Sequence, residues 1–312
     1  MPTALVTGIH GQDGGYLTDL LIANGWQVHG LSRPGEDGDR PDATLHSVEL
    51  TDTKAVAALI EELEPDHVYN LAAVSSVAES WRDPVATTAV NALGAVAILD
   101  ACHRVQERGG RSASVLQATS AEIFGEPAES PQTESTSIRP LNPYGASKAF
   151  AHHAVGAFRN RGLKSVSAIL YNHESPRRPH EFVTRKITST VAAIAQGRAD
   201  KLVLGNLDAR RDWGWAPDYA RAMFLAASHE PADDYVIATG VAHSVREFVG
   251  AAFSHVGIDD WAHLVESDPA LFRPADATEL VGDSTRARSI LGWKPTYSFA
   301  DIVAAMVEED LR

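Results

Sequence analysis

The sequence predicts an α/β protein, with a doubly wound parallel sheet and a smaller C-terminal domain. Apolar segments of strand length alternate with longer helical segments over residues 1–171. This alternation is typical of parallel sheets whose strands are joined by helices. A glycine-rich turn separates the first strand from the first helix. After residue 172 the alternation weakens, which indicates a second domain of different construction.

The elements of the first domain follow in order from these segments. Runs such as "TALV" and "SVSAILY" have the length and apolarity of buried strands. The expected strands are 3–6, 27–32, 46–50, 67–73, 113–119 and 165–171. The expected helices are 14–24, 53–63, 84–107 and one that carries Tyr144 and Lys148. Segment 32–42 contains glycine, proline and charge without an apolar anchor, so it resembles a linker.

The second domain, 172–312, is expected to be interleaved with the first. It opens with a loop rich in proline and arginine, and ends in a helical tail with a "GWKP" stop. Between them we expect helices at 182–197 and 217–228 and a short strand, "LVLG". The strand at 234–239 is expected to return to the sheet of the first domain.

Composition excludes several classes of partner. Of 312 residues, 44% are hydrophobic and 22% charged, and the net charge is −14. The acidic surface repels nucleic acid and anionic membranes, and no apolar run approaches the roughly 18 residues of a membrane helix. The single cysteine, Cys102, excludes an intrachain disulfide and a cysteine-based zinc site, and no metal is expected. The N-terminus lacks signal-peptide features, so we expect a cytoplasmic protein.

The glycines of "LVTGIHGQDGGYL" indicate a dinucleotide site. Gly8, Gly11 and Gly14 lie between the first strand and the first helix. Glycines let the backbone approach a pyrophosphate, and the helix N-terminus offers free N–H groups. Arg33 follows the second strand, where NAD-specific folds place an acid, and an arginine suits the 2′-phosphate of NADP. The alternative is that Arg33 is a solvated loop charge.

Two further strand ends are expected to contact this cofactor. "ELTD" (49–52) ends the third strand, where a side chain can reach the adenine. "NLAA" (70–73) ends the fourth strand, where small residues leave room for the cofactor.

Tyr144 and Lys148 of "NPYGASK" form a candidate catalytic pair. Their i, i+4 spacing puts both on one helix face, and a neighbouring ammonium is expected to lower the tyrosine pKa. Such a pair also occurs by chance on solvated helices. With the glycine turn and the hydroxyl of Ser120, it matches the active-site pattern of extended short-chain dehydrogenases.

"VLQATSAEIFG" (115–125) adds a carboxylate to this pattern. In an extended backbone, side chains at i and i+2 share a face, so Ser120 and Glu122 are expected to face one space. A dehydrogenase or 4-epimerase needs only the hydroxyl, tyrosine and lysine. A 4,6-dehydratase also needs a base that removes the C5 proton once C4 is a ketone. Glu122 fits that role; the alternative is a strand end that is merely polar.

Several longer segments carry a family resemblance. They include "TGIHGQDGGYL", "YNLAAVSSVAESW", "QATSAEIFG", "NHESPRRPHEFVTRKIT" and "LGNLDARRDWGWAPDYARAM". From Val6 to Trp293 the chain resembles the GDP-mannose 4,6-dehydratase family of extended short-chain dehydrogenases. "NHESPRR" and "GNLDARRDWG" are specific to that family; without it, their arginines could equally be solvated loop charges.

The resemblance assigns roles to individual residues. The implied catalytic residues are Ser120, Glu122, Tyr144 and Lys148. The expected cofactor residues are Gly8, Gly11, Gln12, Asp13, Gly14, Arg33, Glu49, Leu50, Leu71, Ala73, Ser75, Lys148, His173 and Arg178. The implied substrate residues are Asn172, Val183, Lys186, Arg211, Arg273 and Asp276. A diphosphate in an acidic protein also needs focused positive charge, which suits Lys186, Arg211 and Arg273.

The chain departs from the family at several points. Ala121 replaces a serine, Ser120 a threonine, Glu49 an aspartate and Asp276 a glutamate, and Asn142 stands where serine is common. The Arg- and Ser-rich loop after the second strand, which holds the family's tetramer together, is shortened to an acidic one. We therefore expect a homodimer, packed through helices 84–107 and 143–160.

The resemblance implies dehydration of GDP-mannose to GDP-4-keto-6-deoxymannose with a tightly bound NADP that is regenerated in each cycle. C4 is oxidised, water is eliminated across C5 and C6, and the hydride returns to C6. One alternative is a 4,6-dehydratase for another GDP-hexose. A nucleotide-sugar 4-reductase or epimerase and a non-catalytic NADP sensor are the others.

Overall fold

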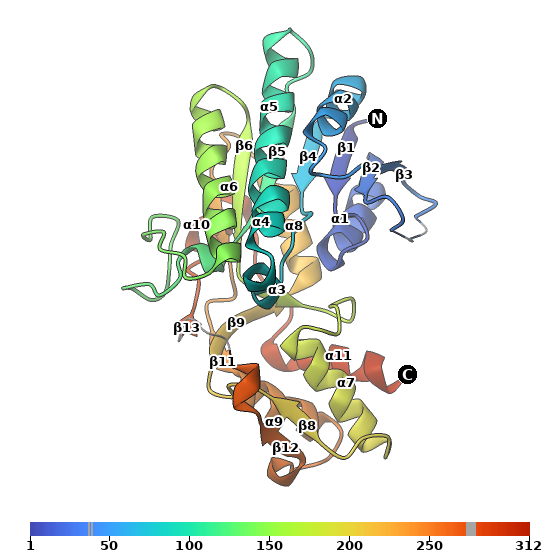
Figure 1. Ribbon diagram of the computed structural model, residues 1–312, viewed down its shortest axis with the longest axis vertical. Coiled ribbons are helices and arrows are strands. Elements are labelled where there is room, and N and C mark those ends of the chain that lie inside the picture. The colour runs from blue at the N-terminus through green and yellow to red at the C-terminus, as the bar shows by residue number, and fades with distance from the viewer. Residues whose placement is uncertain (37, 39, 273–278) are drawn as a thin grey trace.

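The computed structural model describes residues 1–36, 38, 40–272 and 279–312, which form two lobes (Figure 1). The first lobe contains a seven-stranded parallel sheet in the order β10-β6-β5-β4-β1-β2-β3. Its strands are β1 Thr3–Thr7, β2 Gln27–Ser32, β3 Thr44–Ser47, β4 His67–Asn70, β5 Ser114–Ser120, β6 Ser165–Leu170 and β10 Asp234–Ile237. The order reverses between β4 and β1, so the predicted doubly wound fold is confirmed.

Helices cover both faces of this sheet. On one face α1 packs on α8, and α10 packs on α8 and β10. On the other face α5 lies between α2 and α6. These helices are α1 Gln12–Ala23, α2 Thr53–Leu63, α5 Gly94–Glu107, α6 Pro143–Asn160, α8 Ala216–Ser228 and α10 Thr285–Leu291. Each face has its own buried apolar cluster, because parallel sheets need cover on both sides.

The second lobe is smaller. One sheet has the order β11-β9-β13 with β7 also paired to β9, and β12 pairs with β8. The strands are β7 Asn172–Glu174, β8 Leu202–Leu204, β9 Arg210–Trp215, β11 Ala242–Ser244, β12 Val265–Ser267 and β13 Glu279–Leu280. Helices α7 Val183–Ala195, α9 Val245–His255 and α11 Phe299–Leu311 enclose a core around Trp213 and Phe248.

The chain passes between the lobes several times. β6 leads into β7 of the second lobe, and β9 leads back to α8 of the first. The segment expected at 234–239 forms β10, which pairs with β6. The boundary expected near residue 171 stays a prediction, but the two lobes are interleaved in sequence.

The segment 84–107, which was expected to be one helix without membrane-like hydropathy, differs from expectation in both respects. It consists of α4 Pro84–Thr88, a π-helical turn at Ala89–Leu93, and α5. Its length and mean hydropathy of 1.6 would allow it to cross a membrane, so the expectation that no segment approaches that measure was wrong. However, 56% of its apolar window is buried inside the protein, as in the core helix of a globular lobe.

The third strand is displaced from its expected position. The sequence predicts 46–50, whereas β3 covers Thr44–Ser47, where it pairs with residues 29–32 of β2. Leu50 is buried against Gly94 of α5 instead of continuing the strand. The apolar residue that suggested a strand therefore packs between the sheet and a helix.

Candidate active site

The carboxyl ends of β1, β4 and β5 meet at the sheet edge that faces the second lobe (Figure 1). A buried polar chain joins them. The Thr7 hydroxyl donates to Asn70 Oδ1 at 2.8 Å, and Asn70 Nδ2 donates to Gln117 Oε1 at 2.6 Å. Thr7 Oγ1 also accepts from the N–H groups of Leu71 and Ala72, at 3.0 Å each. In open α/β sheets, ligands bind at this reversal of strand order.

The glycine turn fits a dinucleotide pyrophosphate. Gly8 has a φ of +69°, which favours glycine. A Cβ on Gly14 would lie 2.1 Å from the Gly8 carbonyl oxygen, so a side chain there would force the helix away from the turn. α1 begins at Gln12, two residues earlier than expected, and its N-terminus opens at the turn. Free N–H groups at such a position bind phosphate.

Two predicted cofactor residues, Asp13 and His173, form an ion pair between α1 and β7. His173 Nε2 lies 2.9 Å from Asp13 Oδ2, and its Nδ1 lies 2.7 Å from the Tyr171 carbonyl oxygen. Burial acts to lower the pKa of His173, but Asp13 and both hydrogen bonds raise it above its ordinary value. Burial acts to raise the pKa of Asp13, but His173 holds it below the ordinary value. We therefore assign an imidazolium–carboxylate pair.

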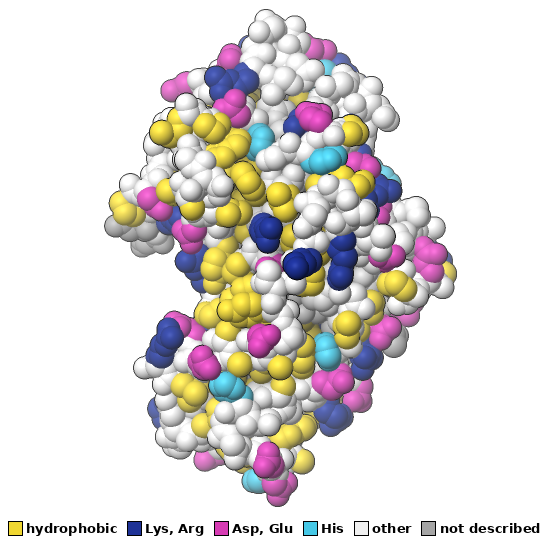
Figure 2. Space-filling model, turned by 180° about the vertical axis from the view of Figure 1, so that it is seen from behind, with side chains coloured by type: hydrophobic (Ala, Val, Ile, Leu, Met, Phe, Trp, Pro, Cys, Tyr) yellow, Lys and Arg dark blue, Asp and Glu magenta, His cyan; other side chains and the backbone are white. Residues whose placement is uncertain are grey.

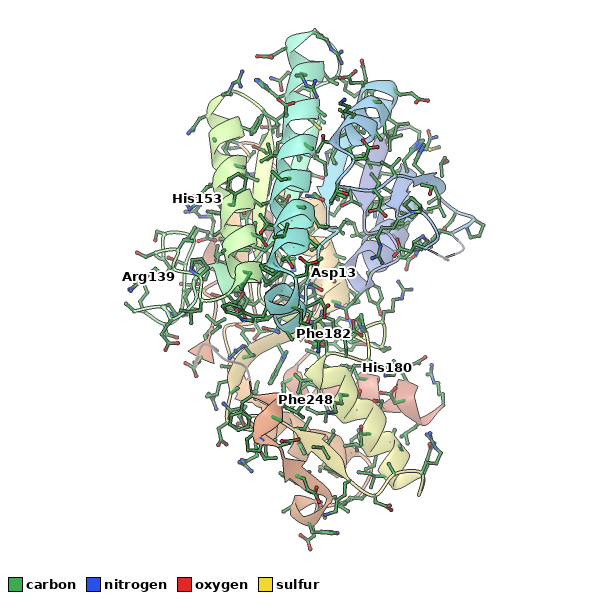
Figure 3. All side chains as sticks on the ribbon, in the orientation of Figure 1. Asp13, Arg139, His153, His180, Phe182 and Phe248 are labelled. Atoms are coloured by element: carbon green, nitrogen blue, oxygen red, sulfur yellow. The ribbon has the colours of Figure 1, made fainter. Side chains whose placement is uncertain are left out.

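The same helix end is tied to the second lobe by neutral hydrogen bonds. Gln12 Nε2 donates to the His173 carbonyl at 3.1 Å, and Gln12 Oε1 accepts from the Ser175 hydroxyl at 2.8 Å. Arg178 Nε lies 3.3 Å from Glu174 Oε2, and the Arg178 Cζ atom lies 3.7 Å from the centroid of the Phe182 ring. Figure 3 shows Asp13 at the end of the first lobe and Phe182 at the facing end of the second.

Tyr144 and Lys148 are buried on α6, behind the carboxyl end of β5. Lys148 Nζ donates to the Ala118 carbonyl at 2.8 Å and lies 5.9 Å from the Tyr144 ring centroid. Burial lowers the pKa of Lys148 to about 8 and raises that of Tyr144 to about 12, against the Ser120 hydroxyl, which acts to lower it. The expected lowering of the Tyr144 pKa by Lys148 was therefore wrong for this structure, because burial outweighs it.

Ser120 and Glu122 are brought together, but not by an extended backbone. Ser120 ends β5, and a 3₁₀ turn at Ala121–Ile123 follows. The expectation that Ser120 and Glu122 face one side because they alternate along a strand was therefore wrong. The Ser120 hydroxyl caps this turn by accepting from the Glu122 N–H at 3.2 Å. Glu122 Oε2 accepts from Asn142 Nδ2 at 2.8 Å, so its carboxylate is held at the start of α6.

The remaining cofactor candidates lie along the same edge. Arg33 directly follows β2, and its side chain is 71% exposed. Glu49 is exposed and Leu50 buried, both after β3. The loop after β4 contains Leu71 and Ala73, which are half-buried, and Ser75, which is exposed.

The predicted substrate residues lie on the second lobe. Asn172 starts β7, Val183 and Lys186 are in the first turn of α7, and Arg211 is on β9. Arg211 is buried, and its Nη1 donates to the Arg210 carbonyl at 2.7 Å. Arg273 and Asp276 lie outside the described residues. Figure 2 shows the surface notched between the lobes, with Lys and Arg side chains near the waist.

Sequence reasoning missed two asparagines that organise this site. Asn142 caps α6 by accepting from the Gly145 N–H at 2.8 Å, in addition to its bond to Glu122. An Asn-Pro pair before a helix was the available signal. Asn91, in the π-helical turn, donates to the Ser147 hydroxyl at 3.0 Å and exchanges hydrogen bonds with Val74. No local pattern pointed to it.

Two measured cavities lie away from this edge and are not the site. One of about 330 Å³ lies between α2 and α5, and one of about 750 Å³ lies at the amino-terminal edge of the sheet. Within the described ranges, no three His, Cys, Asp or Glu residues are grouped to hold a metal ion.

A glycine turn, a Tyr–Lys helix and a strand-end serine on this fold define an extended short-chain dehydrogenase. Solved structures of this class match the whole chain. UDP-glucose 4-epimerase from Thermus thermophilus, in complex with NAD, has a TM-score of 0.85 and 28% identity over 99% of this chain and 98% of that one. RMD from Pseudomonas aeruginosa, complexed with NADPH, has a TM-score of 0.84 and 26% identity over 100% and 99%.

The family is more specific than this class. The family model for GDP-mannose 4,6 dehydratase matches residues 5–306. GDP-mannose 4,6 dehydratase 2 of Arabidopsis thaliana is 43% identical over 99% of this chain and 86% of its own length. The chain therefore belongs to the GDP-mannose 4,6-dehydratase family, as its resemblance predicted.

Proposed function

We propose that this protein dehydrates GDP-mannose to GDP-4-keto-6-deoxymannose. The observation that carries the proposal is the Glu122 carboxylate, which Asn142 holds at the start of the helix that bears Tyr144. The backbone N–H of Glu122 is bound to the Ser120 hydroxyl. A carboxylate in this position supplies the base that elimination requires and that 4-epimerisation does not. The family membership of the chain supports the same reaction.

The site suits a nicotinamide dinucleotide, which we propose to be NADP. Gly8 and Gly14 allow the close turn, and the N-terminus of α1 opens at that turn, where its free N–H groups would hold the phosphates. Arg33 at the end of β2 is the residue that favours the 2′-phosphate. When bound, the cofactor supplies a hydride acceptor and, in its oxidised form, a positive charge.

The chain's own residues divide the proton transfers between them. Tyr144 accepts the proton of the C4 hydroxyl as hydride leaves C4. Because burial raises the Tyr144 pKa to about 12, this step requires positive charge from Lys148 and from the bound oxidised cofactor. Glu122 removes the C5 proton, which the C4 ketone has acidified. Glu122 passes that proton to the C6 hydroxyl, with Ser120 assisting, so that water leaves. The proton held by Tyr144 returns to C5 when the hydride returns to C6. Lys148 holds the site's positive charge only below about pH 8, the pKa to which burial lowers it.

The decisive experiment is incubation with GDP-mannose and no added reductant. Loss of one water from the sugar nucleotide, measured by mass, supports the dehydratase. An isomer of unchanged mass supports a 4-epimerase. No change contradicts GDP-mannose as the substrate, and a panel of other GDP-hexoses then tests the alternative dehydratase.

We also propose a homodimer. Large apolar side chains on α3 Val77–Arg82, α4, the π-helical turn and α6 are between 46% and 78% exposed. They are Trp81, Val85, Leu93 and Phe150. The shortened loop after β2 turns back on its own subunit, since Arg40 pairs with Asp19 of α1 at 2.8 Å. This favours a dimer over the tetramer that the longer family loop supports. The cytoplasmic location stays a prediction.

A further inference from the structure

The carboxylate of Glu36 occupies the anion-binding donors at the end of β2. Glu36 Oε2 accepts from the Arg33 backbone N–H at 3.0 Å, and Glu36 Oε1 accepts from Arg33 Nη2 at 3.4 Å. Both carboxylate oxygens are therefore bound by one residue. A backbone N–H and a guanidinium are also the donors that hold a phosphate.

Burial is unequal between these two partners. The Glu36 side chain is 27% exposed, whereas that of Arg33 is 71% exposed. The carboxylate thus lies against the protein with the arginine over it. Burial acts to raise the Glu36 pKa, but the hydrogen bonds from Arg33 and the charge of its guanidinium hold it below the ordinary value. Glu36 is consequently ionised at neutral pH.

The segment that carries Glu36 lies beside the glycine turn. His10 lies between Gly8 and Gly11, and its Nε2 is buried without a hydrogen-bond partner among the described residues. Gly38 packs on the ring so closely that a Cβ there would lie 2.3 Å from His10 Nδ1. The end of β2 next to this turn is where dinucleotide-binding folds place the adenosine ribose.

We propose that Glu36 sets the choice between NADP and NAD. Its carboxylate competes with a ribose 2′-phosphate for Arg33, and it accepts a hydrogen bond from a ribose 2′-hydroxyl. NADP binding then requires that the Arg33–Glu36 pair open, whereas NAD binding leaves it intact. This inference rests on the nicotinamide cofactor of the proposed function and names the residue that tunes its selectivity.

Isothermal titration calorimetry of NADP⁺ and NAD⁺ tests the proposal without turnover. Glu36→Gln keeps the side-chain shape but frees the Arg33 guanidinium for the phosphate. The ratio of NADP to NAD affinity is expected to rise about tenfold or more, the effect of one charge-assisted hydrogen bond. In an Arg33→Ala background the same substitution is expected to raise that ratio less, because there it removes only the acceptor for the 2′-hydroxyl and the repulsion of the 2′-phosphate.

Asp42→Asn is the matched control. It removes the same charge from the same loop, but Asp42 pairs with Arg40, at 3.2 Å. An equal rise in the NADP preference of this control would overturn the proposal, as would a Glu36→Gln ratio equal to wild type. Failure of both nucleotides to bind wild-type protein would overturn the cofactor site itself. Binding without conversion of GDP-mannose would contradict only the proposed reaction.

Discussion

At the scale of single residues, the candidate chemistry depends on how Glu122 is held. The carboxylate accepts a hydrogen bond from Asn142, which also caps α6. The N–H of Glu122 is bound to the Ser120 hydroxyl. The start of α6 therefore positions both Glu122 and Tyr144, so the proposed base for elimination and the proposed base for C4 oxidation are separate groups held by one helix.

Replacing Glu122 with Gln should separate these two steps. The amide keeps the shape and accepts the hydrogen bond, but it cannot take the C5 proton. Loss of a general base typically costs about 10²–10⁴-fold in rate. C4 oxidation should survive, so mixing the variant with NADP⁺ and GDP-mannose should produce NADPH absorbance that persists.

Tyr144→Phe is the control for that experiment and should give neither product nor NADPH. Near wild-type turnover by Glu122→Gln would contradict the assignment. Loss of C4 oxidation as complete as in Tyr144→Phe would make Glu122 a substrate-positioning residue instead.

The Asp13–His173 pair predicts a pH dependence with a definite sign. The His173 pKa is raised in the folded protein, so its stabilising contribution is fully present below the unfolded value of about 6.5 and is lost as pH rises through the folded pKa. The Asp13 pKa is lowered, so its contribution is lost as pH falls through that value. The free energies of unfolding in urea of His173→Gln and wild type should differ most between the folded pKa of Asp13 and the folded pKa of His173.

The difference in unfolding free energy between wild type and His173→Gln should shrink as the pH rises above the folded pKa of His173. The titration of His173 by NMR gives that pKa directly. A His173 pKa at or below 6.5 would contradict the assigned ion pair.

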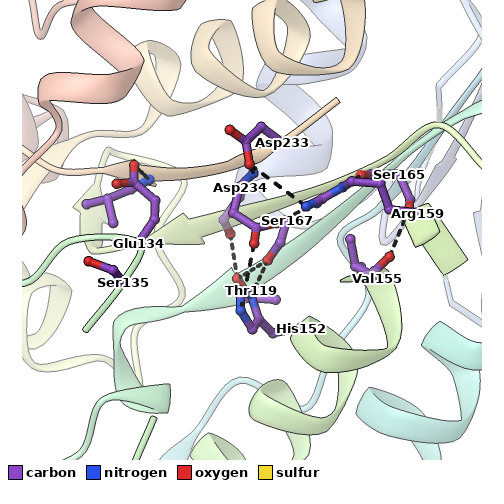
Figure 4. A network of polar contacts seen from close by, with 12 residues as sticks. Thr119, Glu134, Ser135, His152, Val155, Arg159, Ser165, Ser167, Asp233 and Asp234 are labelled. Carbon is purple, nitrogen blue, oxygen red and sulfur yellow. Dashed lines mark hydrogen bonds and ion pairs between the residues drawn. The ribbon is translucent and has the colours of Figure 1, made fainter. Parts of the chain in front are cut away.

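At the scale of elements, α6 is fixed to the sheet by a polar network that runs from β5 to β10 (Figure 4). The Ser167 hydroxyl lies 3.0 Å from Thr119 Oγ1 and 2.8 Å from His152 Nδ1. Arg159, further along α6, pairs with Asp234 of β10. Thr119 precedes Ser120, and His152 follows Lys148 by one helical turn. The network therefore fixes the positions of two proposed catalytic residues, on β5 and α6, relative to each other.

Ser167→Ala should therefore destabilise the protein more than an ordinary serine substitution. Ser167 is fully buried, and its loss leaves the buried Thr119 hydroxyl and the half-buried His152 imidazole without this partner. That typically costs about 1–3 kcal/mol, measured as the free energy of unfolding in urea.

Ser228→Ala is the control, because this exposed serine also donates one hydrogen bond, to the Phe224 carbonyl. It should stay within about 0.5 kcal/mol of wild type. Equal losses for the two variants would show that the network contributes nothing beyond a local hydrogen bond.

At the scale of the whole molecule, the apolar surface of α3, α4, the π-helical turn and α6 predicts the assembly. Light scattering at low micromolar concentration should give a mass near twice 33.5 kDa. Phe150→Asp places a charge on this surface and should shift the mass toward the monomer. A wild-type mass near four times 33.5 kDa would contradict the dimer.

Ile290→Asp provides the matched control. Ile290 is also an exposed apolar residue, but it lies on α10. This variant should keep the wild-type mass. If it dissociated the protein as Phe150→Asp does, the interface would have to lie elsewhere.

The sequence by itself determined the fold class, the glycine turn and the Tyr144–Lys148 helix, because each is a local pattern of spacing and polarity. The helices at 53–63 and 84–107 followed from periodicity in the same way. Where an apolar residue is buried by a contact outside the sheet, the local pattern failed. Leu50 suggested a longer third strand, but it packs on Gly94 of α5.

Only the tertiary structure decided which groups touch. Asp13 and His173 are 160 residues apart, and Asn142 reaches Glu122 across 20 residues of loop and helix start. The pKa of Tyr144 likewise depends on burial, which the i, i+4 spacing to Lys148 does not encode. Contacts and desolvation arise when distant segments pack together, so a sequence pattern specifies the side chains of a site but not the environment that tunes them.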